Sequence, residues 1–162
     1  MAPDITVREI KATDYPLLED FLYHAVFQPP GEPLIPREVI FQPEVYVYIK
    51  DFGCGDDCGV VAESDGQIIG IAWTRIIPGF GHIDPQTPEL AISVLPQHRG
   101  RGVGALLMTK LFELLRGRGY RQTSLAVQRE NAAARFYTRL GYQTIRQNDE
   151  EFIMLKKIVK HA

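Results

Sequence analysis

Apolar residues along most of the chain either alternate with polar ones or recur every three to four positions. Alternation rich in β-branched residues predicts strands, whereas helical spacing predicts amphipathic helices. Ser64-Asp65-Gly66 predicts a hairpin turn, and Asn148-Asp149 predicts the turn of a final hairpin over residues 142–158. The other expected strands cover residues 5–10, 59–63, 67–77, 89–95 and 122–128.

Helical spacing predicts three helices, over residues 13–27, 103–119 and 131–141. In the first, Asp14 is placed to cap the helix and Pro16 suits its first turn.

Two further segments are harder to assign. Residues 43–52 fit either a strand or a helix, and Pro43 at a first helical position favours the helix. Residues 28–36 contain four prolines and should be irregular. The order of elements implies a mixed sheet with helices on both faces, in one domain of 162 residues.

Composition narrows the function classes. The chain is 45% hydrophobic and 23% charged, with a formal net charge of −2, which is typical of a folded protein and argues against nucleic-acid binding. No apolar run approaches the roughly 18 residues that a membrane span needs. The N-terminal sequence lacks the apolar core of a signal peptide, so we expect a cytoplasmic protein without membrane contact.

The two cysteines, Cys54 and Cys58, stand close together in a Gly/Asp segment. A zinc site wants about four ligands, and the histidines are scattered along the chain. We therefore expect two reduced thiols and no metal, with a redox or metal role as the alternative.

A glycine-rich segment, LPQHRGRGVGALLM, lies between a predicted strand and a predicted helix. A phosphate-binding P-loop is excluded because Gly104 is followed by Ala105 rather than by lysine. A dinucleotide fingerprint, Gly100-x-Gly102-x-x-Ala105, is present. Its context is wrong, because several strands precede it and no acidic residue follows at the end of the next strand.

A third interpretation uses the spacing Arg99-x-x-Gly102-x-Gly104. Backbone N–H groups at a helix N-terminus, together with the charges of Arg99 and Arg101, would bind a pyrophosphate without a metal. Purely structural glycines are the alternative.

These residues resemble the signature of the GNAT superfamily, the acetyl-CoA-dependent N-acetyltransferases. The segments IIGIAW, ISVLP and GYRQTSLAV, and the stretch from Asn131 to Tyr142, look like that family in the expected order. The resemblance implies an α/β (α+β mixed) fold with a mostly antiparallel sheet of six to seven strands.

The resemblance also implies how acetyl-CoA would be held. Backbone groups of Ile92, Ser93 and Val94 would pair with the pantetheine arm, and the Val94 N–H would stabilise the oxyanion. Asn131 would contact the pantetheine, cap its helix, or do both. The pyrophosphate would be bound by Arg99, Gly100, Arg101, Gly102, Val103 and Gly104.

Two side chains are candidates for proton transfer. Tyr137 stands where the family carries its general acid, and a phenol of pKa about 10 suits a thiolate of pKa about 8–9. Its alternative is an aromatic residue packed beside Phe136. Glu89 begins the strand that leads to the glycine segment and is the candidate base, with a solvated surface acid as the alternative.

The acceptor is the least defined part of the prediction. Residues 28–52 and 78–88 should form its pocket, with Trp73 and Arg75 lining it, although Trp73 also fits a core position. We expect a small-molecule amine or a peptide N-terminus as acceptor, and a homodimer is left open. A non-catalytic acyl-CoA-binding or sensor protein on the same fold is the alternative function.

Overall fold

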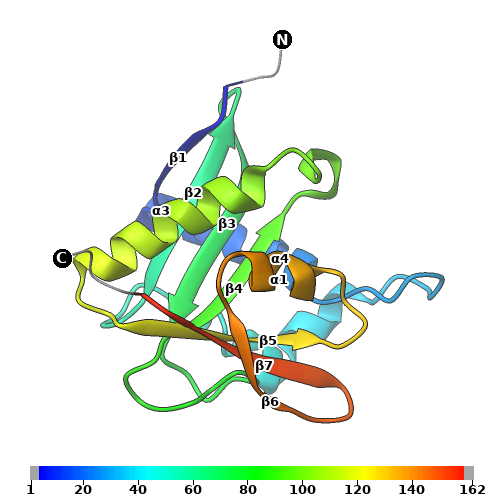
Figure 1. Cartoon of the computed structure of the whole chain (residues 1–162). Coiled ribbons are helices and arrows are strands. Elements are labelled where there is room, and N and C mark those ends of the chain that lie inside the picture. The colour runs from blue at the N-terminus through cyan, green and yellow to red at the C-terminus, as the bar shows by residue number, and fades with distance from the viewer. Residues whose placement is uncertain (1–3, 159–162) are drawn as a thin grey trace.

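The computed structural model describes residues 4–158, and the remaining residues of the predicted domain lie outside it. Its seven strands form one sheet in the order β1-β2-β3-β4-β5-β7-β6 (Figure 1). Every described strand pair is antiparallel except β4 with β5, which confirms the expected mixed, mostly antiparallel sheet. The strands are β1 (Thr6–Glu9), β2 (Cys58–Ser64), β3 (Gln67–Arg75), β4 (Glu89–Val94), β5 (Gln122–Gln128), β6 (Gln143–Gln147) and β7 (Glu151–Lys157).

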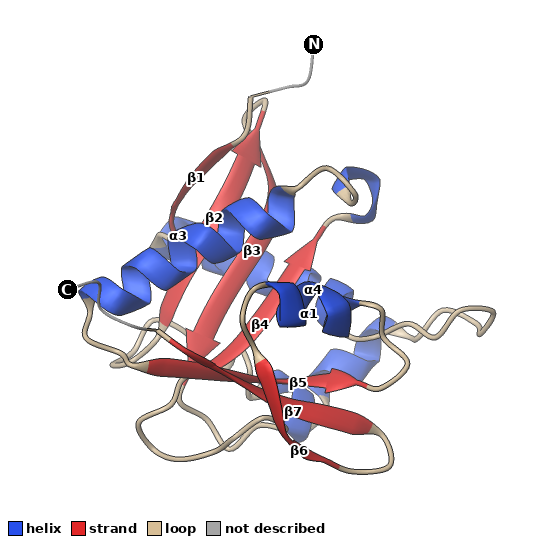
Figure 2. Ribbon diagram, viewed as in Figure 1, coloured by secondary structure: helices blue, strands red, loops and turns tan. Residues whose placement is uncertain are grey.

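Helices cover both faces of the sheet, as expected (Figure 2). On one face, α3 buries Leu107 and Leu111 against β2 and β3. On the other face, α1 buries Phe21 and Leu22 beside Ile71. The helices are α1 (Leu18–Ala25), α2 (Pro43–Tyr46), α3 (Val103–Gly117) and α4 (Ala133–Arg139), with 3-10 turns η1 (Ala12–Leu17), η2 (Arg37–Phe41) and η3 (Pro96–His98).

The start of the first helix differs from the prediction. Asp14 does not cap α1; a 3-10 turn precedes α1, and the buried Asp14 carboxylate accepts the Lys11 N–H at 2.8 Å. The same carboxylate pairs with Arg8 of β1 at 2.8 Å. Asp14 therefore caps the start of the 3-10 turn from its third position, rather than the start of α1, and also ties that turn to the edge of the sheet.

The ambiguous segment resolves as a short helix. Pro43 occupies the first position of α2, as predicted, but the α-helix ends at Tyr46 and turns follow. Both predicted hairpins are present, with β2 paired to β3 and β6 paired to β7.

The strands β4 and β5 separate from a common point. They pair only where Glu89 of β4 meets Ser124 of β5. Beyond that pair β4 continues to Val94 along β3 with its other edge unpaired by β5. This splayed edge, together with α1 and α4, defines the site described below.

Candidate functional site

The glycine segment forms an anion cradle at the start of α3. Gly100 and Gly102 have φ values of +75° and +78°, a left-handed conformation that favours glycine. The backbone conformation of the loop therefore favours glycine at both positions. A Cβ at either position would meet nothing within 4 Å, so the space above them is open. The first backbone bond of the helix runs from the Leu106 N–H to the Gly102 carbonyl, which leaves the N–H groups of residues 103–105 directed outward.

The end of β4 directs backbone groups into the splay. The Leu95 N–H donates to the Ile69 carbonyl at 2.8 Å, so residue 95 faces β3. Because antiparallel pairs alternate, the N–H and C=O of Val94 face the opposite side, toward the gap between β4 and β5. The same alternation directs the backbone of Ile92 into the gap, whereas that of Ser93 pairs with β3. Arg99 donates from Nε to the Val94 carbonyl at 2.9 Å.

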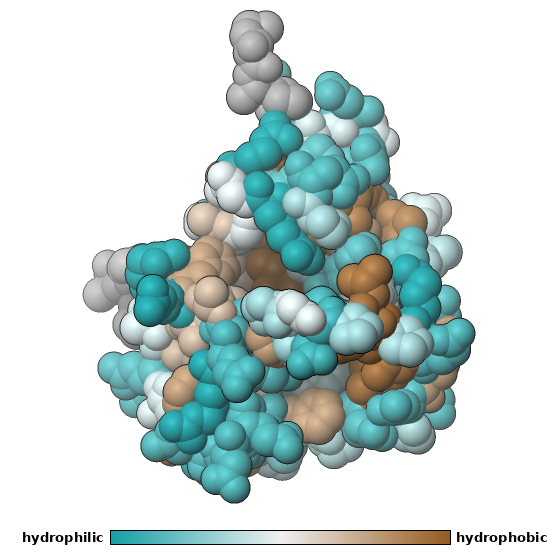
Figure 3. Space-filling view, turned by 90° about the vertical axis from the view of Figure 1, so that its right-hand side faces the viewer, coloured by the Kyte–Doolittle hydropathy of each residue, from teal (hydrophilic) through white to brown (hydrophobic). Residues whose placement is uncertain are grey.

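A cleft of about 1230 Å³ runs from the cradle along the splayed edge. It exceeds the usual range for ligand pockets, roughly 300–1000 Å³. Figure 3 shows this side of the molecule, where apolar and polar surface alternate. Of the predicted cofactor-binding residues, the cleft is lined by Ile92, Ser93, Val94, Arg99, Gly100, Gly102, Val103, Gly104 and Asn131.

Arg101 is the one predicted cofactor residue that does not line the cleft. Its guanidinium lies 3.0 Å from Nδ1 of His98, which does line the cleft. The Asn131 Oδ1 accepts the Ala133 N–H at 2.9 Å, so Asn131 caps the first turn of α4 and also lines the cleft.

Tyr137 projects from α4 into the cleft lining. Its ring packs against Phe136 and Tyr142, with centroids 5.5 and 5.8 Å away. Burial raises the pKa of its hydroxyl to about 12. The phenol is therefore protonated at neutral pH, as a proton donor must be.

Glu89 is buried, with 2% of its surface exposed, so the solvated alternative is wrong. Its Oε2 accepts the Gly81 N–H at 2.9 Å and the hydroxyl proton of Tyr48. Its Oε1 is buried without a hydrogen-bond partner among the described residues. Burial raises the pKa of this carboxyl, and the Tyr48 and Gly81 hydrogen bonds oppose that rise.

Like Glu89, the predicted acceptor residues Trp73 and Arg75 do not line the cleft. Trp73 is fully buried and donates from Nε1 to the Tyr48 carbonyl at 2.9 Å. Arg75 is 8% exposed and pairs with Asp57 at 2.9 Å, while its Nη1 donates to the Val47 carbonyl at 2.9 Å. Both residues fasten the segment after α2 to β3.

Of the two segments expected to form the acceptor pocket, only the first contributes to the cleft. Gln28, Leu34 and Ile35 line it, and Leu34 is 80% exposed. Part of the second segment packs against Glu89 instead: the Gly81 N–H donates to Oε2, and a Cβ added to Gly79 would lie 2.6 Å from Oε1.

Sequence reasoning missed two basic residues of the cleft, His24 and Arg139. Burial, and then the charge of Arg99, lower the pKa of His24, so its imidazole is neutral at pH 7. Arg139, the last residue of α4, adds a positive charge to the cleft. No motif marks either residue, because each reaches the cleft only through the position of its helix.

The cleft fits acetyl-CoA in three respects. The cradle offers outward N–H groups and Arg99 for phosphates, the free β4 edge offers backbone groups for an extended amide chain, and the volume suits a nucleotide-sized ligand. Both cysteines are free thiols, Cys54 exposed and Cys58 buried. Of the helices between residues 4 and 158, none combines the length and apolar composition that a membrane crossing requires.

The model of the acetyltransferase (GNAT) family matches residues 20–142. A mycothiol acetyltransferase from Tsukamurella paurometabola is 33% identical over 94 residues, which cover 56% of this chain and 28% of that protein. The chain thus matches less than a third of the length of this relative.

Solved structures show the same fold. The PaiA N-acetyltransferase from Thermoplasma acidophilum, in complex with coenzyme A, aligns over 95% of this chain and 99% of its own, with a TM-score of 0.66 and 18% identity. The ribosomal-protein-S18-alanine N-acetyltransferase from Escherichia coli aligns over 98% of this chain and 97% of its own, with a TM-score of 0.67 and 20% identity.

Proposed function

Because the chain belongs to the acetyltransferase (GNAT) family, we propose that it moves an acetyl group from acetyl-CoA to a primary amine by direct attack. The observation that carries the proposal is one cleft in which the α3 cradle, the free edge of β4 and Tyr137 come together. The proposed unit is a single acetyltransferase domain.

The chain would hold acetyl-CoA by two sets of groups. The N–H groups at the start of α3 and the Arg99 guanidinium would bind the pyrophosphate. The backbone of Ile92 and Val94 would pair with the pantetheine arm as an added strand pairs with a sheet edge. The Val94 N–H would then donate to the thioester oxygen as negative charge develops there.

Two side chains would balance the protons. Glu89 would take a proton from the incoming ammonium, directly or through one water, so that an N–H bond breaks and an O–H bond forms. The free amine attacks the carbonyl carbon, a C–N bond forms, and the C–S bond breaks. Tyr137 would donate its hydroxyl proton to the departing sulfur. The proton then left on the acetylated nitrogen returns the tyrosine to its neutral form through solvent, and Glu89 releases the proton it took up to bulk water.

The acceptor we propose is a small-molecule amine or a peptide N-terminus. The Leu34 and Ile35 side of the cleft is apolar, so an acceptor with an apolar group beside its amine fits better than a highly charged one. One solved neighbour is named for the alanine of a ribosomal protein and the curated relative for mycothiol, so the two names point to different acceptors.

The test is CoA release from acetyl-CoA with a panel of amines: tyramine, glucosamine, spermidine, free amino acids and short peptides with a free N-terminus. We expect release with at least one amine, and Tyr137→Phe should lower kcat about 10²–10⁴-fold while CoA binding persists. Tyr15→Phe is the matched control, because Tyr15 packs on Phe52 away from the cleft. If Tyr137→Phe is as active as the control, the acid role is wrong. If CoA binds but no amine is acetylated, the chain is a CoA-binding protein without transferase activity.

A further inference from the structure

A hydrogen-bonded cluster around Glu89 lies outside the predicted motifs. It combines Tyr48 from the segment after α2 with Phe80 and Gly81 from the loop between β3 and β4. The Tyr48 hydroxyl accepts the Phe80 N–H at 3.0 Å and donates its own proton to the Glu89 Oε2. The Tyr48 and Phe80 rings stack, with centroids 6.4 Å apart and planes 19° apart.

The backbone of Tyr48 is itself held by β3. Trp73 donates to the Tyr48 carbonyl at 2.9 Å, and Arg75 donates to the Val47 carbonyl at 2.9 Å. Arg75 is fixed in turn by two hydrogen bonds to Asp57, of 2.9 and 3.1 Å. The tyrosine ring therefore starts from an anchored backbone, which limits the directions in which its hydroxyl can point.

The two oxygens of Glu89 are not equivalent. Oε2 receives two donors, Tyr48 and Gly81, whereas the buried Oε1 has no partner among residues 4–158. A carboxylate oxygen that already accepts two hydrogen bonds is less basic than a free one, so Oε1 is the oxygen available to take a proton.

We propose that Tyr48 is a positioning residue for Glu89: it holds Oε2 and the carboxylate plane so that Oε1 serves as the proton acceptor. The proposal rests on the base role of Glu89 proposed above. Neither Tyr48 nor Glu89 lines the cleft, so Glu89 would take the proton through a water, and Tyr48 would act only through Glu89.

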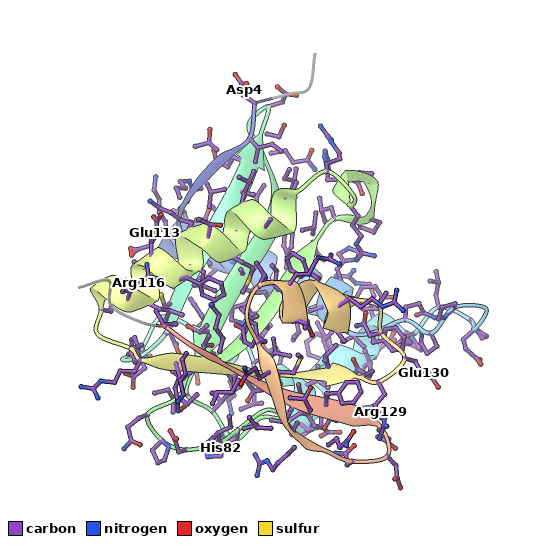
Figure 4. The ribbon with its side chains drawn as sticks, viewed as in Figure 1. Asp4, His82, Glu113, Arg116, Arg129 and Glu130 are labelled. Atoms are coloured by element: carbon purple, nitrogen blue, oxygen red, sulfur yellow. The ribbon has the colours of Figure 1, made fainter. Side chains whose placement is uncertain are left out.

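Other titratable groups also face this carboxyl. The charge of His82, on the loop over the cluster (Figure 4), lowers the Glu89 pKa, and Glu151 at the start of β7 raises it. Arg75 is paired with Glu89 in the β3–β4 register but binds Asp57. The Tyr48 hydrogen bond is the largest contribution that opposes burial, so its removal should have the clearest effect.

The experiment is a titration of the Glu89 carboxyl carbon by NMR, in the wild type and in Tyr48→Phe, a change that keeps the ring on Phe80. Losing a donor to a carboxylate disfavours its charged form, so the Glu89 pKa should rise by about one to two units in the variant. The acid limb of the kcat profile, measured with the best amine of the panel, should move upward by the same amount, with KM for acetyl-CoA unchanged. Tyr46→Phe is the control, since Tyr46 packs on Phe41 in the neighbouring helix.

Each outcome decides between the two proposals. If Tyr48→Phe leaves the Glu89 titration unchanged, the positioning role is overturned. The NMR titration can be measured without knowing the acceptor. If the titration shifts but Glu89→Gln keeps the wild-type rate and acid limb, Glu89 is not the base and the positioning role falls with it. If Glu89→Gln removes the acid limb while Tyr48→Phe does not move it, only the role of Tyr48 is wrong.

Discussion

Two substitutions of Gly102 distinguish the effect of charge on CoA binding from the effect of backbone strain. The residue has a φ of +78°, and an added Cβ would meet nothing within 4 Å, so a side chain placed there costs backbone strain without a clash at its first atom. Asn and Asp have nearly the same volume, and both tolerate the left-handed conformation better than other side chains. Gly102→Asn and Gly102→Asp therefore form a matched pair that differs by one negative charge.

The magnitude follows from the position of Gly102 at the start of α3. The strain should cost each variant about 1–2 kcal/mol of unfolding free energy, or a few degrees in Tm. A carboxylate about 4 Å from a phosphate is repelled by about 1 kcal/mol in water and about 4 kcal/mol at an effective dielectric constant of 20. Gly102→Asp should thus bind CoA about fivefold to about a thousandfold more weakly than Gly102→Asn.

The assay is calorimetric titration of CoA at two salt concentrations. The gap between the two variants should be widest near 0.01 M salt, where the Debye length is about 30 Å, and should narrow at 0.5 M. Equal CoA affinity in both variants at low salt would show that no phosphate lies at this loop. An Asp variant that unfolds well below the Asn variant would show that the charge acts on folding instead.

Three further changes test the fold around the site. Asp14→Asn removes the carboxylate whose pKa the Arg8 hydrogen bond lowers, so the free energy of unfolding measured with urea at pH 7 should fall by about 1–3 kcal/mol. This difference should shrink as the pH falls below about 4, the pKa of the unfolded chain, and vanish only below the lowered pKa of the folded carboxyl, where the wild-type group is protonated as well. Gly81→Ala should lower kcat and thermal stability but not CoA affinity. The added Cβ would lie 2.7 Å from the backbone of β5 and push the loop away from Glu89. An unchanged kcat would refute this prediction. Leu107→Ala, fully buried, should cost about 2–5 kcal/mol in thermal unfolding, whereas Leu106→Ala, 46% exposed on the same helix, should cost less than about 1 kcal/mol.

Most elements followed from local patterns. The strand at residues 122–128 and the start of the helix at Val103 lie where the sequence predicts them, because a bounded apolar run and a glycine before a periodic segment are local signals. Asp14 caps a 3-10 turn as well as forming an ion pair, and the sequence did not show the second role because the partner, Arg8, lies on β1. A capping residue and an ion-pair partner look the same in sequence, and only the tertiary contact distinguishes them.

The site residues also differ in whether a local motif or a tertiary contact identifies them. The cradle, Asn131 and Tyr137 lie in contiguous motifs, and apart from Arg101 they all line one cleft. The sequence could not predict the hydrogen-bond partners of Glu89. Tyr48 lies far from Glu89 in the sequence, and Gly81 lies on a loop without a hydrophobic period. Glu89 and Ser93 share one face of β4 because alternate residues of a strand do, and the sequence could not show that α1 and the loop over Glu89 bury that face.

The splay of β4 and β5 explains why these two parts of the site belong together. An unpaired strand edge is a liability, because it invites pairing with other chains. Here α1 and α4 flank the edge, so only a ligand-sized strip of β4 backbone remains accessible in the cleft. The vertex of the same splay is the Glu89–Ser124 pair, so the opening that exposes the backbone of Val94 also fixes Glu89 at its closed end. In the proposed reaction, a ligand that pairs with Ile92 and Val94 would lie along the strand that begins with this carboxylate.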